Sequence, residues 1–391
     1  MTVLRRLGDI ASFQRGLTYS KGDEVPSSSK VVLRSNNIDL DSHTLDLSEL
    51  KYLREDFEIP ADRKVRKDSI FICMSNGSKQ HVGKVAFIDT DMDYAFGGFM
   101  GLIVPQPGVS AKYIFYACNS SAYRTFLSQV GNGIGITNLR FSDLEKFEIH
   151  IPSLSDQCRI VEELDLLSSI IEKKNKQLRD LDALSESLFY ESFGEELMSN
   201  DSYLPLSDIC SLIADGDWIE SKDQSESGIR LIQTGNIGNG FYKDKGDKAR
   251  FISEQTFKRL GCTEIFAGDI LISRLPDPVG RACILPESAL RRITAVDCSI
   301  IRLNGKVLPS VFIQYTKSRE YSDNLGTYIT GATRKRISRK NLSQVAFLVP
   351  SIRKQELFAK QIDAIERQRK AIEQSIVNCE VLLASRMDRY F

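Results

Sequence analysis

The chain has 391 residues, a hydrophobic content of 42% and a charged content of 27%, which are ordinary values for a globular protein. This length is too great for one ordinary core and predicts two domains with connecting structure. Acidic and basic residues both number 52, and this zero net charge argues against a uniformly basic nucleic-acid-binding protein. No apolar run approaches the ~18 residues needed to cross a bilayer, and Met1 to Gly16 lacks the apolar segment of a secretory signal. We expect a cytoplasmic protein without membrane contact.

Catalytic and metal-binding motifs are missing from the sequence. The eight cysteines are scattered, no Cys-x-x-Cys occurs, and only three histidines could join them, so we expect free thiols and no metal site. The chain has no Gly-x-Gly-x-x-Gly loop, no Walker loop and no Asn-Pro-Pro or Asp-Pro-Pro of an amino-methyltransferase. We expect no catalytic residue and no bound cofactor, and we assign any catalysis to partner proteins.

Residues 1–152 predict a globular domain of mixed α and β structure. Short apolar runs at 31–33, 70–72, 85–88 and 102–104 are separated by turn residues, as strands are, and a helix is predicted at about 111–130. Hydrogen-bonding side chains follow several strands, and Arg pairs with guanine and Asn or Gln with adenine through bidentate geometry. The candidate DNA contacts are Arg34, Asn36, Asn76, Lys79, Gln80, Asn132 and Arg140. Taken singly, each of these loop residues is better explained as an ordinary turn residue, because Asn and Gly are common turn formers.

Residues 153–198 predict a long spacer helix. Apolar residues recur here in alternating steps of four and three, which is the seam of a coiled coil. Ser153 and Asp156 can cap its start. This segment carries 5 basic and 11 acidic residues. The seam positions are Ile160, Leu164, Leu167, Ile171, Lys174, Leu178, Leu181, Ser185 and Leu188.

Residues 199–350 repeat the first domain at offsets of 197 to 200 residues. Leu7-Gly8-Asp9-Ile10 returns as Leu206-Ser207-Asp208-Ile209, and Arg34–Ile38 returns as Gln233–Ile237. Strands are predicted at 229–233, 270–273, 282–285 and 299–303, and a helix at 309–321. Asn37 and Asn236 recur in both copies, which favours a structural turn over a base contact. We expect Trp218 to be a partly buried anchor. The candidate DNA contacts of this copy are Gln233, Lys243, Arg274, Arg334, Lys335, Arg336 and Arg339.

The densest basic run holds four of those contacts. Residues 334–340 contain five basic side chains in seven positions, directly after Gly331 and before a strand that ends at Pro350. A solvated charge run is the ordinary alternative. Because the backbone of this run is held on both sides, we favour contact with DNA phosphates.

Residues 351–391 repeat the spacer helix, with every seam position displaced by 198 residues from Phe358 to Arg386. Two copies of one unit usually pair by a pseudo-twofold axis, so we expect the two helices to form an antiparallel coiled coil. The acidic first helix would then lie against the second, which carries 8 basic and 6 acidic residues. The alternative is that each helix packs only on its own domain.

The two domain–helix junctions carry a resemblance to a known family. Ile151-Pro152-Ser153-Leu154 with Gln157 returns as Val349-Pro350-Ser351-Ile352 with Gln355, and each leads into a heptad helix. This duplicated pattern resembles the DNA-specificity (S) subunit of type I restriction–modification enzymes along the whole chain. The first copy departs from it with Asp68-Ser69-Ile70 in place of Gly268-Asp269-Ile270, and the second with Leu357-Phe358 after Gln355.

The resemblance implies a non-catalytic subunit in which each globular copy is a target-recognition domain for one half of a split, asymmetric site in double-stranded DNA. It implies helices that set the gap between the half-sites and dock two modification (methyltransferase) subunits, which bind S-adenosylmethionine. Restriction (translocase–nuclease) subunits can join such a complex. The alternative of a different class is a protein-binding scaffold whose paired domains hold another protein.

Overall fold

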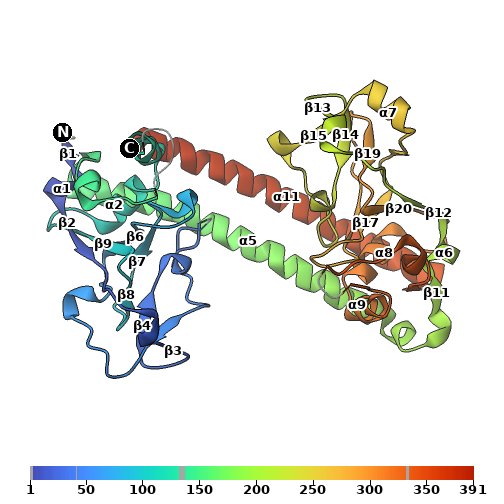
Figure 1. Cartoon of the computed structure of the whole chain (residues 1–391), viewed down its shortest axis with the longest axis horizontal. Coiled ribbons are helices and arrows are strands. Elements are labelled where there is room, and N and C mark those ends of the chain that lie inside the picture. The colour runs from blue at the N-terminus through green and yellow to red at the C-terminus, as the bar shows by residue number, and fades with distance from the viewer. Residues whose placement is uncertain (1–2, 41, 132–136, 332–333) are drawn as a thin grey trace. The chain divides into compact units, whose positions relative to one another are not determined.

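The computed structural model describes residues 3–40, 42–131, 137–331 and 334–391. The chain divides into two compact units. Unit 1 comprises Met1–Asn175 and Gln374–Phe391, and unit 2 comprises Lys176–Glu373. Each unit therefore contains one globular repeat, part of helix α5 (Leu154–Leu197) and part of helix α11 (Ile352–Tyr390) (Figure 1).

In its described residues, the globular part of unit 1 contains two four-stranded sheets and one two-stranded ribbon. One sheet has the order β2-β9-β6-β7 with antiparallel neighbours, and the other has the order β3-β5-β4-β8. In the second sheet β4 and β8 run parallel, and β1 pairs with β10. The strands are β1 (Val3–Arg6), β2 (Ala11–Arg15), β3 (Glu24–Val25), β4 (Lys30–Leu33), β5 (Lys51–Leu53), β6 (Ser69–Cys73), β7 (Val85–Ile88), β8 (Ala95–Phe96), β9 (Met100–Pro105) and β10 (Glu148–Ile151).

Strand β6 explains how the layers of unit 1 pack. All five of its residues are buried, because successive side chains point to opposite faces and both faces are covered. Ile70 and Ile72 join the core that contains the helices, whereas Phe71 and Cys73 join the core that contains strands of the second sheet. The middle of β6 is therefore fixed by packing, and the loop that follows Cys73 leaves the sheet at a defined place.

Unit 2 repeats this architecture with one additional strand. Its sheets have the orders β12-β20-β17-β18 and β13-β15-β14-β19-β16, and β11 pairs with β21. The parallel pair returns as β14 and β19. The strands are β11 (Tyr203–Pro205), β12 (Cys210–Asp215), β13 (Gln224–Ser225), β14 (Ile229–Ile232), β15 (Arg250–Ile252), β16 (Glu264–Ile265), β17 (Ile270–Ser273), β18 (Ala282–Ile284), β19 (Arg292–Thr294), β20 (Cys298–Leu303) and β21 (Ala346–Leu348).

The single helix predicted in each globular repeat is wrong, because each is two helices. Ser120 and Ser318 each accept a hydrogen bond from a backbone amide three residues later, so each starts a new helix in place of continuing the old one. The helices of unit 1 are α1 (Leu7–Ile10), α2 (Ala111–Ala117), α3 (Ser121–Val130) and α4 (Phe141–Leu144). Those of unit 2 are α6 (Leu206–Ile209), α7 (Glu254–Leu260), α8 (Pro309–Thr316), α9 (Arg319–Gly326) and α10 (Arg339–Leu342).

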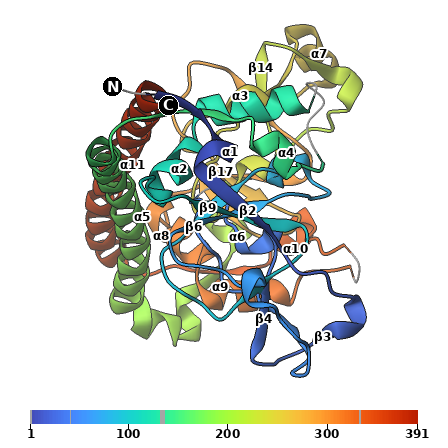
Figure 2. The same cartoon turned by 90° about the vertical axis from the view of Figure 1, so that its left-hand side faces the viewer.

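Helices α5 and α11 lie side by side and run antiparallel in each unit, as predicted (Figures 1 and 2). In unit 1, Glu163 near the start of α5 pairs with Arg386 near the end of α11 at 2.9 Å. In unit 2, Asp182 pairs with Arg369 at 2.5 Å, and the rings of Phe193 and Phe358 lie 5.1 Å apart. Every predicted seam position is buried or partly buried. These ion pairs place the acid on α5 and the base on α11, in line with the charge difference in the sequence.

The repeated glutamine of each junction locks the start of a long helix to its own globular part. The Gln157 side chain accepts a hydrogen bond from the Ser110 amide at 2.8 Å and donates one to the Pro152 carbonyl at 3.0 Å. Gln355 accepts from the Leu308 amide at 2.8 Å and donates to the carbonyls of Pro350 and Lys306. Both glutamines are buried. The junction motif is thus a structural clamp, which explains why it occurs once per repeat.

Among the helices of the described residues, none is both long and apolar enough to cross a membrane.

Candidate nucleic-acid interface

A buried asparagine shapes the same short turn at the end of β4 and of β14. The Asn37 Oδ1 atom accepts a hydrogen bond from the Arg34 amide at 2.8 Å, and its Nδ2 atom donates to the carbonyls of Asp46 and Glu49. The Asn236 Oδ1 atom accepts from the Gln233 amide at 3.0 Å, and its Nδ2 atom donates to the Lys243 carbonyl at 2.9 Å. With exposed fractions of 1% and 2%, neither asparagine can reach a ligand. The structural-turn reading of this pair is confirmed.

A cation holds each turn, and it is the buried Lys84 in unit 1 and the partly buried Arg281 in unit 2. The Lys84 Nζ atom donates to the Ile38 carbonyl at 2.7 Å, and the Arg281 Nε atom donates to the Ile237 carbonyl at the same distance. Burial lowers the pKa of both side chains. The hydrogen bonds to the carbonyls offset the cost of removing these charges from water. Arg281 also donates to the carbonyls of Thr234, Leu275 and Pro278. One guanidinium thus ties two loops of unit 2 together.

A glycine permits a close backbone approach beside each turn. A Cβ atom at Gly16 would lie 2.0 Å from the Gly97 carbonyl oxygen, and one at Gly216 would lie 2.2 Å from that of Ala295. Any side chain here would force the two segments apart. These glycines fix where β2 and β12 end, and they bring the residues just before them, Arg15 and Asp215, to the same edge as the turns.

An open groove of about 690 Å³ lies at this edge of unit 1. The turn at 34–36, the loop at 75–77, the end of β2 and the segment at 97–100 line it. Three predicted DNA contacts, Arg34, Asn36 and Asn76, come together here, and Asn76 is tied to the turn by a 2.9 Å hydrogen bond from its Nδ2 atom to the Ser35 Oγ atom. Burial, and next the Glu24 carboxylate, raise the pKa of Tyr19 in the groove wall, which keeps its hydroxyl protonated.

A second depression of about 590 Å³ in unit 1 shares its rim with the groove, and Arg140 lines it. Arg15 and Phe99 line both, and the 71% exposed Phe99 ring stands on the shared rim. Sequence reasoning missed both residues. Their signal was positional. Arg15 precedes Gly16, which the close approach requires, and Phe99 follows Gly97-Gly98, where Gly97 supplies the carbonyl that Gly16 approaches.

The remaining contacts predicted for unit 1 lie away from this groove or outside the described residues. Lys79 and Gln80 are exposed on the short 3-10 helix η4 (Lys79–His81), in the same loop as Asn76 but not in the groove wall. Asn132 falls in 132–136, which lies outside the described residues.

In unit 2 the equivalent turn presents Gln233 and Lys243. Gln233 is half-buried and starts the turn, in the place that Arg34 has in unit 1. Lys243 is exposed, and its Nζ atom lies 5.4 Å from the centroid of the Phe241 ring. The two residues share a hairpin whose backbone Asn236 holds, so both side chains leave from a fixed frame.

Arg274 departs from the expectation that it contacts DNA, because its side chain is buried. With an exposed fraction of 5%, its guanidinium donates to the Val296 carbonyl and lies 3.6 Å from the Asp215 carboxylate. Arg339 approaches the same carboxylate at 3.7 Å but stays exposed. Arg274 therefore supports the edge from within, and only Arg339 of the two can reach a ligand.

The first residues of the basic run of unit 2, Arg334, Lys335 and Arg336, belong to a basic hairpin that the Thr330–Arg336 bridge closes. The Thr330 and Arg336 backbones exchange hydrogen bonds of 2.9 and 2.8 Å, and a Cβ atom at Gly331 would lie 2.3 Å from the Arg334 carbonyl oxygen. Ile337 is fully buried, and its amide donates to the Arg274 carbonyl at 3.2 Å. Arg334, Lys335 and Arg336 are exposed. The run is thus a supported cationic edge rather than a loose tail.

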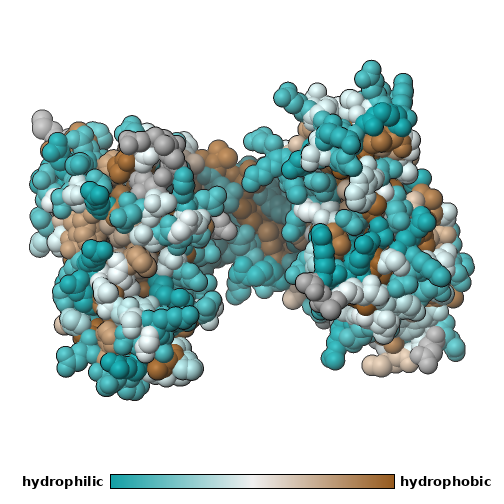
Figure 3. All heavy atoms as spheres, viewed as in Figure 1, coloured by the Kyte–Doolittle hydropathy of each residue, from teal (hydrophilic) through white to brown (hydrophobic). Residues whose placement is uncertain are grey.

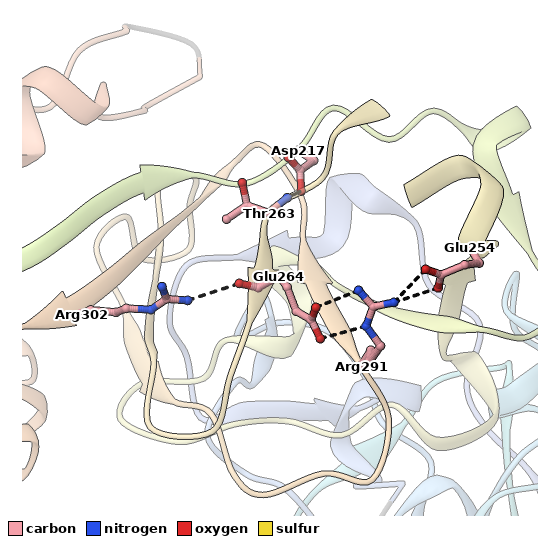
Figure 4. A network of polar contacts seen from close by, with 6 residues as sticks. All are labelled: Asp217, Glu254, Thr263, Glu264, Arg291 and Arg302. Carbon is pink, nitrogen blue, oxygen red and sulfur yellow. Dashed lines mark hydrogen bonds and ion pairs between the residues drawn. The ribbon is translucent and has the colours of Figure 1, made fainter. Parts of the chain in front are cut away.

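The prediction that Trp218 is a partly buried anchor is wrong, since 70% of its surface is exposed. Its loop is tied down by Asp217, whose carboxylate accepts a hydrogen bond from the Thr263 amide at 2.9 Å (Figure 4). Arg291, which bridges Glu254 of α7 and Glu264 of β16, braces that part of the sheet. Because the backbone around it is bonded elsewhere, the indole is left on the surface beside the edge.

Comparison with known proteins agrees with the duplicated architecture. The type I restriction modification DNA specificity domain matches residues 2–180 and again 201–379. The StySPI specificity subunit of Salmonella potsdam is 30% identical over 168 residues, which cover 43% of this chain and 35% of that protein. The EcoKI specificity subunit of Escherichia coli K12 is 22% identical over 387 residues, which cover 93% of this chain and 80% of that protein.

Two solved structures share the fold. A chain from a structure of the assembly and conformational transition of a type I R-M system has a TM-score of 0.56 and 16% identity, with 100% of this chain and 97% of that one covered. The S subunit from M. genitalium has a TM-score of 0.53 and 13% identity, with 100% and 96% covered. The resemblance predicted from the repeated junction is confirmed, and the chain belongs to the family of type I restriction–modification DNA-specificity subunits, with one specificity domain in each repeat.

Proposed function

We propose that this chain is the non-catalytic subunit that recognises a split site in double-stranded DNA, with each unit contacting one half. The single observation that carries the proposal is the duplicated edge. In both units the same buried asparagine, cation and glycine hold a turn at the end of a parallel strand. The side chains presented there are Arg and Asn in one unit and Gln and Lys in the other, as expected for recognition of different bases.

The basic hairpin of unit 2 suits a positioning role. Its three exposed cations adjoin backbone that is hydrogen-bonded at Arg336 and Ile337, which suits contact with phosphates. The groove of unit 1 is lined by three cations, Arg15, Lys21 and Arg34, together with uncharged hydrogen-bonding groups, a combination that suits base edges. Together they combine an electrostatic anchor with a specific contact surface.

The long helices suit the docking of partner subunits and the spacing of half-sites. Large apolar side chains of both helices remain at the surface (Figure 3). Exposed apolar side chains that gather into a patch mark protein–protein contact. We propose that two modification subunits dock here, that they bind S-adenosylmethionine and methylate adenine, and that restriction subunits can join. The exposed apolar residues are Leu154, Leu166, Leu184, Ile352, Leu357, Val377, Val381 and Leu382.

Genome-wide adenine methylation in the host, with and without the gene, tests the proposal. We expect one split motif to lose methylation when the gene is removed and to regain it on complementation. If no motif changes, a pull-down with the tagged chain distinguishes a silent methyltransferase, which would be captured, from a scaffold that binds other proteins. Binding of duplex DNA should also fall steeply between low and moderate salt, because phosphate contacts release counterions. A salt-independent interaction would favour the protein scaffold.

A further inference from the structure

Arg34 and Gln233 leave the protein from equivalent backbone positions. Each is the first residue after the strand of the parallel pair, where Leu33 lies opposite Phe96 and Ile232 lies opposite Thr294. Their backbone angles are similar, with φ −134° and ψ −176° for Arg34 and φ −123° and ψ 169° for Gln233. In both, the amide donates to the buried asparagine side chain and the carbonyl accepts from that asparagine's amide.

The two turns are also held from the same side. Lys84 and Arg281 each follow a glycine with positive φ, 83° at Gly83 and 88° at Gly280. A buried tyrosine hydroxyl donates to the carbonyl of each glycine, at 3.1 Å and 2.9 Å. The cation after each glycine then reaches the carbonyl that ends the turn. Both side chains are thus presented on rigid frames, which is what sequence-specific contact requires.

Arg34 has hydrogen-bonding capacity that its own unit leaves unused. It lines the groove, and its nearest carboxylate, Glu49, lies 4.0 Å away and is mostly exposed. Within the described part of the chain, its buried Nε atom has no hydrogen-bond partner. Asn76, by contrast, donates to Ser35 and accepts from the Ser78 amide. Compared with Asn76, Arg34 is the stronger donor and has hydrogen bonds left to make.

The two side chains differ in the base that they can hold. The arginine fork offers two donors, which match the O6 and N7 acceptors of guanine in the major groove. A glutamine amide offers one donor and one acceptor, which match the N7 and N6 positions of adenine. Arginine facing adenine would place a donor against the N6 donor, so neither side chain can substitute for the other.

We propose that Arg34 contacts a guanine in the half-site of unit 1, and that Gln233 contacts an adenine at the equivalent position in the half-site of unit 2. This inference rests on the proposed function and adds the identity of one base in each half. The equivalent position carries different bases because the frame is shared and only the side chain at its start has changed.

The test compares adenine methylomes and duplex binding for the wild-type chain and two variants, each with the modification subunit of its system. Arg34→Gln should change one guanine to adenine in the first half of the motif, and Gln233→Arg should change one adenine to guanine in the second half. Wild-type binding should prefer the proposed base roughly ten- to hundred-fold at each position. Arg54→Gln, in an exposed residue paired with Asp23 and Asp56 outside the groove, should leave the motif unchanged.

A second measurement serves if a variant fails to fold. The wild-type complex is bound to duplexes in which single purines are replaced by their 7-deaza analogues, which lack the N7 acceptor. Replacement of one particular guanine in the first half should weaken binding about ten-fold or more, and so should replacement of one particular adenine in the second half. The inference is overturned if Arg34→Gln weakens binding to all sequences equally, or if no guanine in the first half is sensitive to 7-deaza replacement. The proposed function still stands in that case, provided that the wild-type complex methylates a split motif. A wild-type complex without a split motif would overturn the function itself.

Discussion

Units 1 and 2 share their buried framework and differ at their exposed edge. The asparagine of the turn, the glycine of the close approach and the glutamine of the clamp are identical in the two repeats. At the edge, Arg15 is replaced by Asp215, Arg34 by Gln233 and Met74 by Arg274. The constant asparagine and glutamine satisfy backbone groups, and the constant glycine permits the close backbone approach. Of the variable residues, Arg15 and Arg34 line the groove, whereas Met74 and Arg274 are both buried, and Arg274 has the Asp215 carboxylate as its partner.

The substitution of Met74 by Arg274 shows that the variable positions change together. In unit 2 the buried guanidinium of Arg274 has the Asp215 carboxylate as its partner, at 3.6 Å. In unit 1 the equivalent pair is Met74 and Arg15, and Arg15 is exposed and lines both depressions. The acid at 215 is thus used inside the unit, whereas the base at 15 is available to a ligand. The two units therefore present different side chains at the same edge of a shared fold.

Removal of the charges of the basic hairpin should have the largest effect on affinity. Only the DNA contacts of unit 2 should be lost. Changing Arg334, Lys335 and Arg336 together to Gln removes three phosphate contacts, which should lower the logarithmic salt slope by about 2.7 and reduce affinity about a hundred-fold at physiological salt. The bases recognised should not change. Equilibrium binding at several salt concentrations measures both quantities.

Arg319, Lys360 and Arg367 provide a matched control for that triple variant, since they are exposed residues of unit 2 outside the edge. Changing them to Gln alters the net charge equally and should leave the slope close to the wild-type value. An equal loss in both triples would mean that total charge, and not the hairpin, determines affinity.

Loss of the buried asparagine should destabilise unit 1 more than unit 2. Asn37→Ala removes three hydrogen bonds and Asn236→Ala removes two, so the free energy of unfolding should fall by about 3 and about 2 kcal/mol. Denaturant unfolding followed by hydrogen exchange in each unit distinguishes the two losses. Equal losses, or a loss in the unit that was not changed, would contradict the independent roles of the two turns.

Shortening the helices should alter the gap and nothing else. Removal of four residues from each helix, 174–177 and 373–376, shortens each by about 6 Å and rotates it by about 40° beyond a full turn. Both changes correspond to a gap shorter by one to two base pairs, because one base pair rotates DNA by about 35°. The methylome should show both half-sites intact around the shorter gap. A gap of unchanged length would disprove the spacer role of the helices.

The architecture followed from the sequence because buried patterns repeat. The heptad seam and the strands at 70–72 and 85–88 were predicted correctly, since each depends on apolar periodicity. The break within the helix at 111–130 was missed because Ser120 is an N-cap only if the chain turns there, and the apolar pattern on either side of it does not show the turn.

The edge was predictable in part. Arg34, Asn36 and Asn76 lie together because strand ends converge, which a strand pattern indicates. Arg274 was expected to be exposed and is buried, because the Asp215 carboxylate lies beside it. Trp218 was expected to be partly buried and is exposed, because its loop is bonded through Asp217 to Thr263. Both contacts join residues distant in sequence, so the sequence pattern does not show them. Arg15 is of a residue type that pairs with guanine, but it is followed by no recognisable turn motif, and Phe99 was marked only by its position after two glycines.

The most direct test of the central claim duplicates one unit's recognition surface. In the variant chain, residues 203–349 are inserted in place of residues 3–151. Both junctions then keep their glutamine clamps, and both globular parts carry the edge of unit 2. The methylome of a host that expresses this chain with its modification subunit is then determined. If each unit recognises one half-site independently, the motif should contain the second half-site at both ends of the gap, on opposite strands because the helices pair antiparallel. A motif that retains the first half-site would contradict the account.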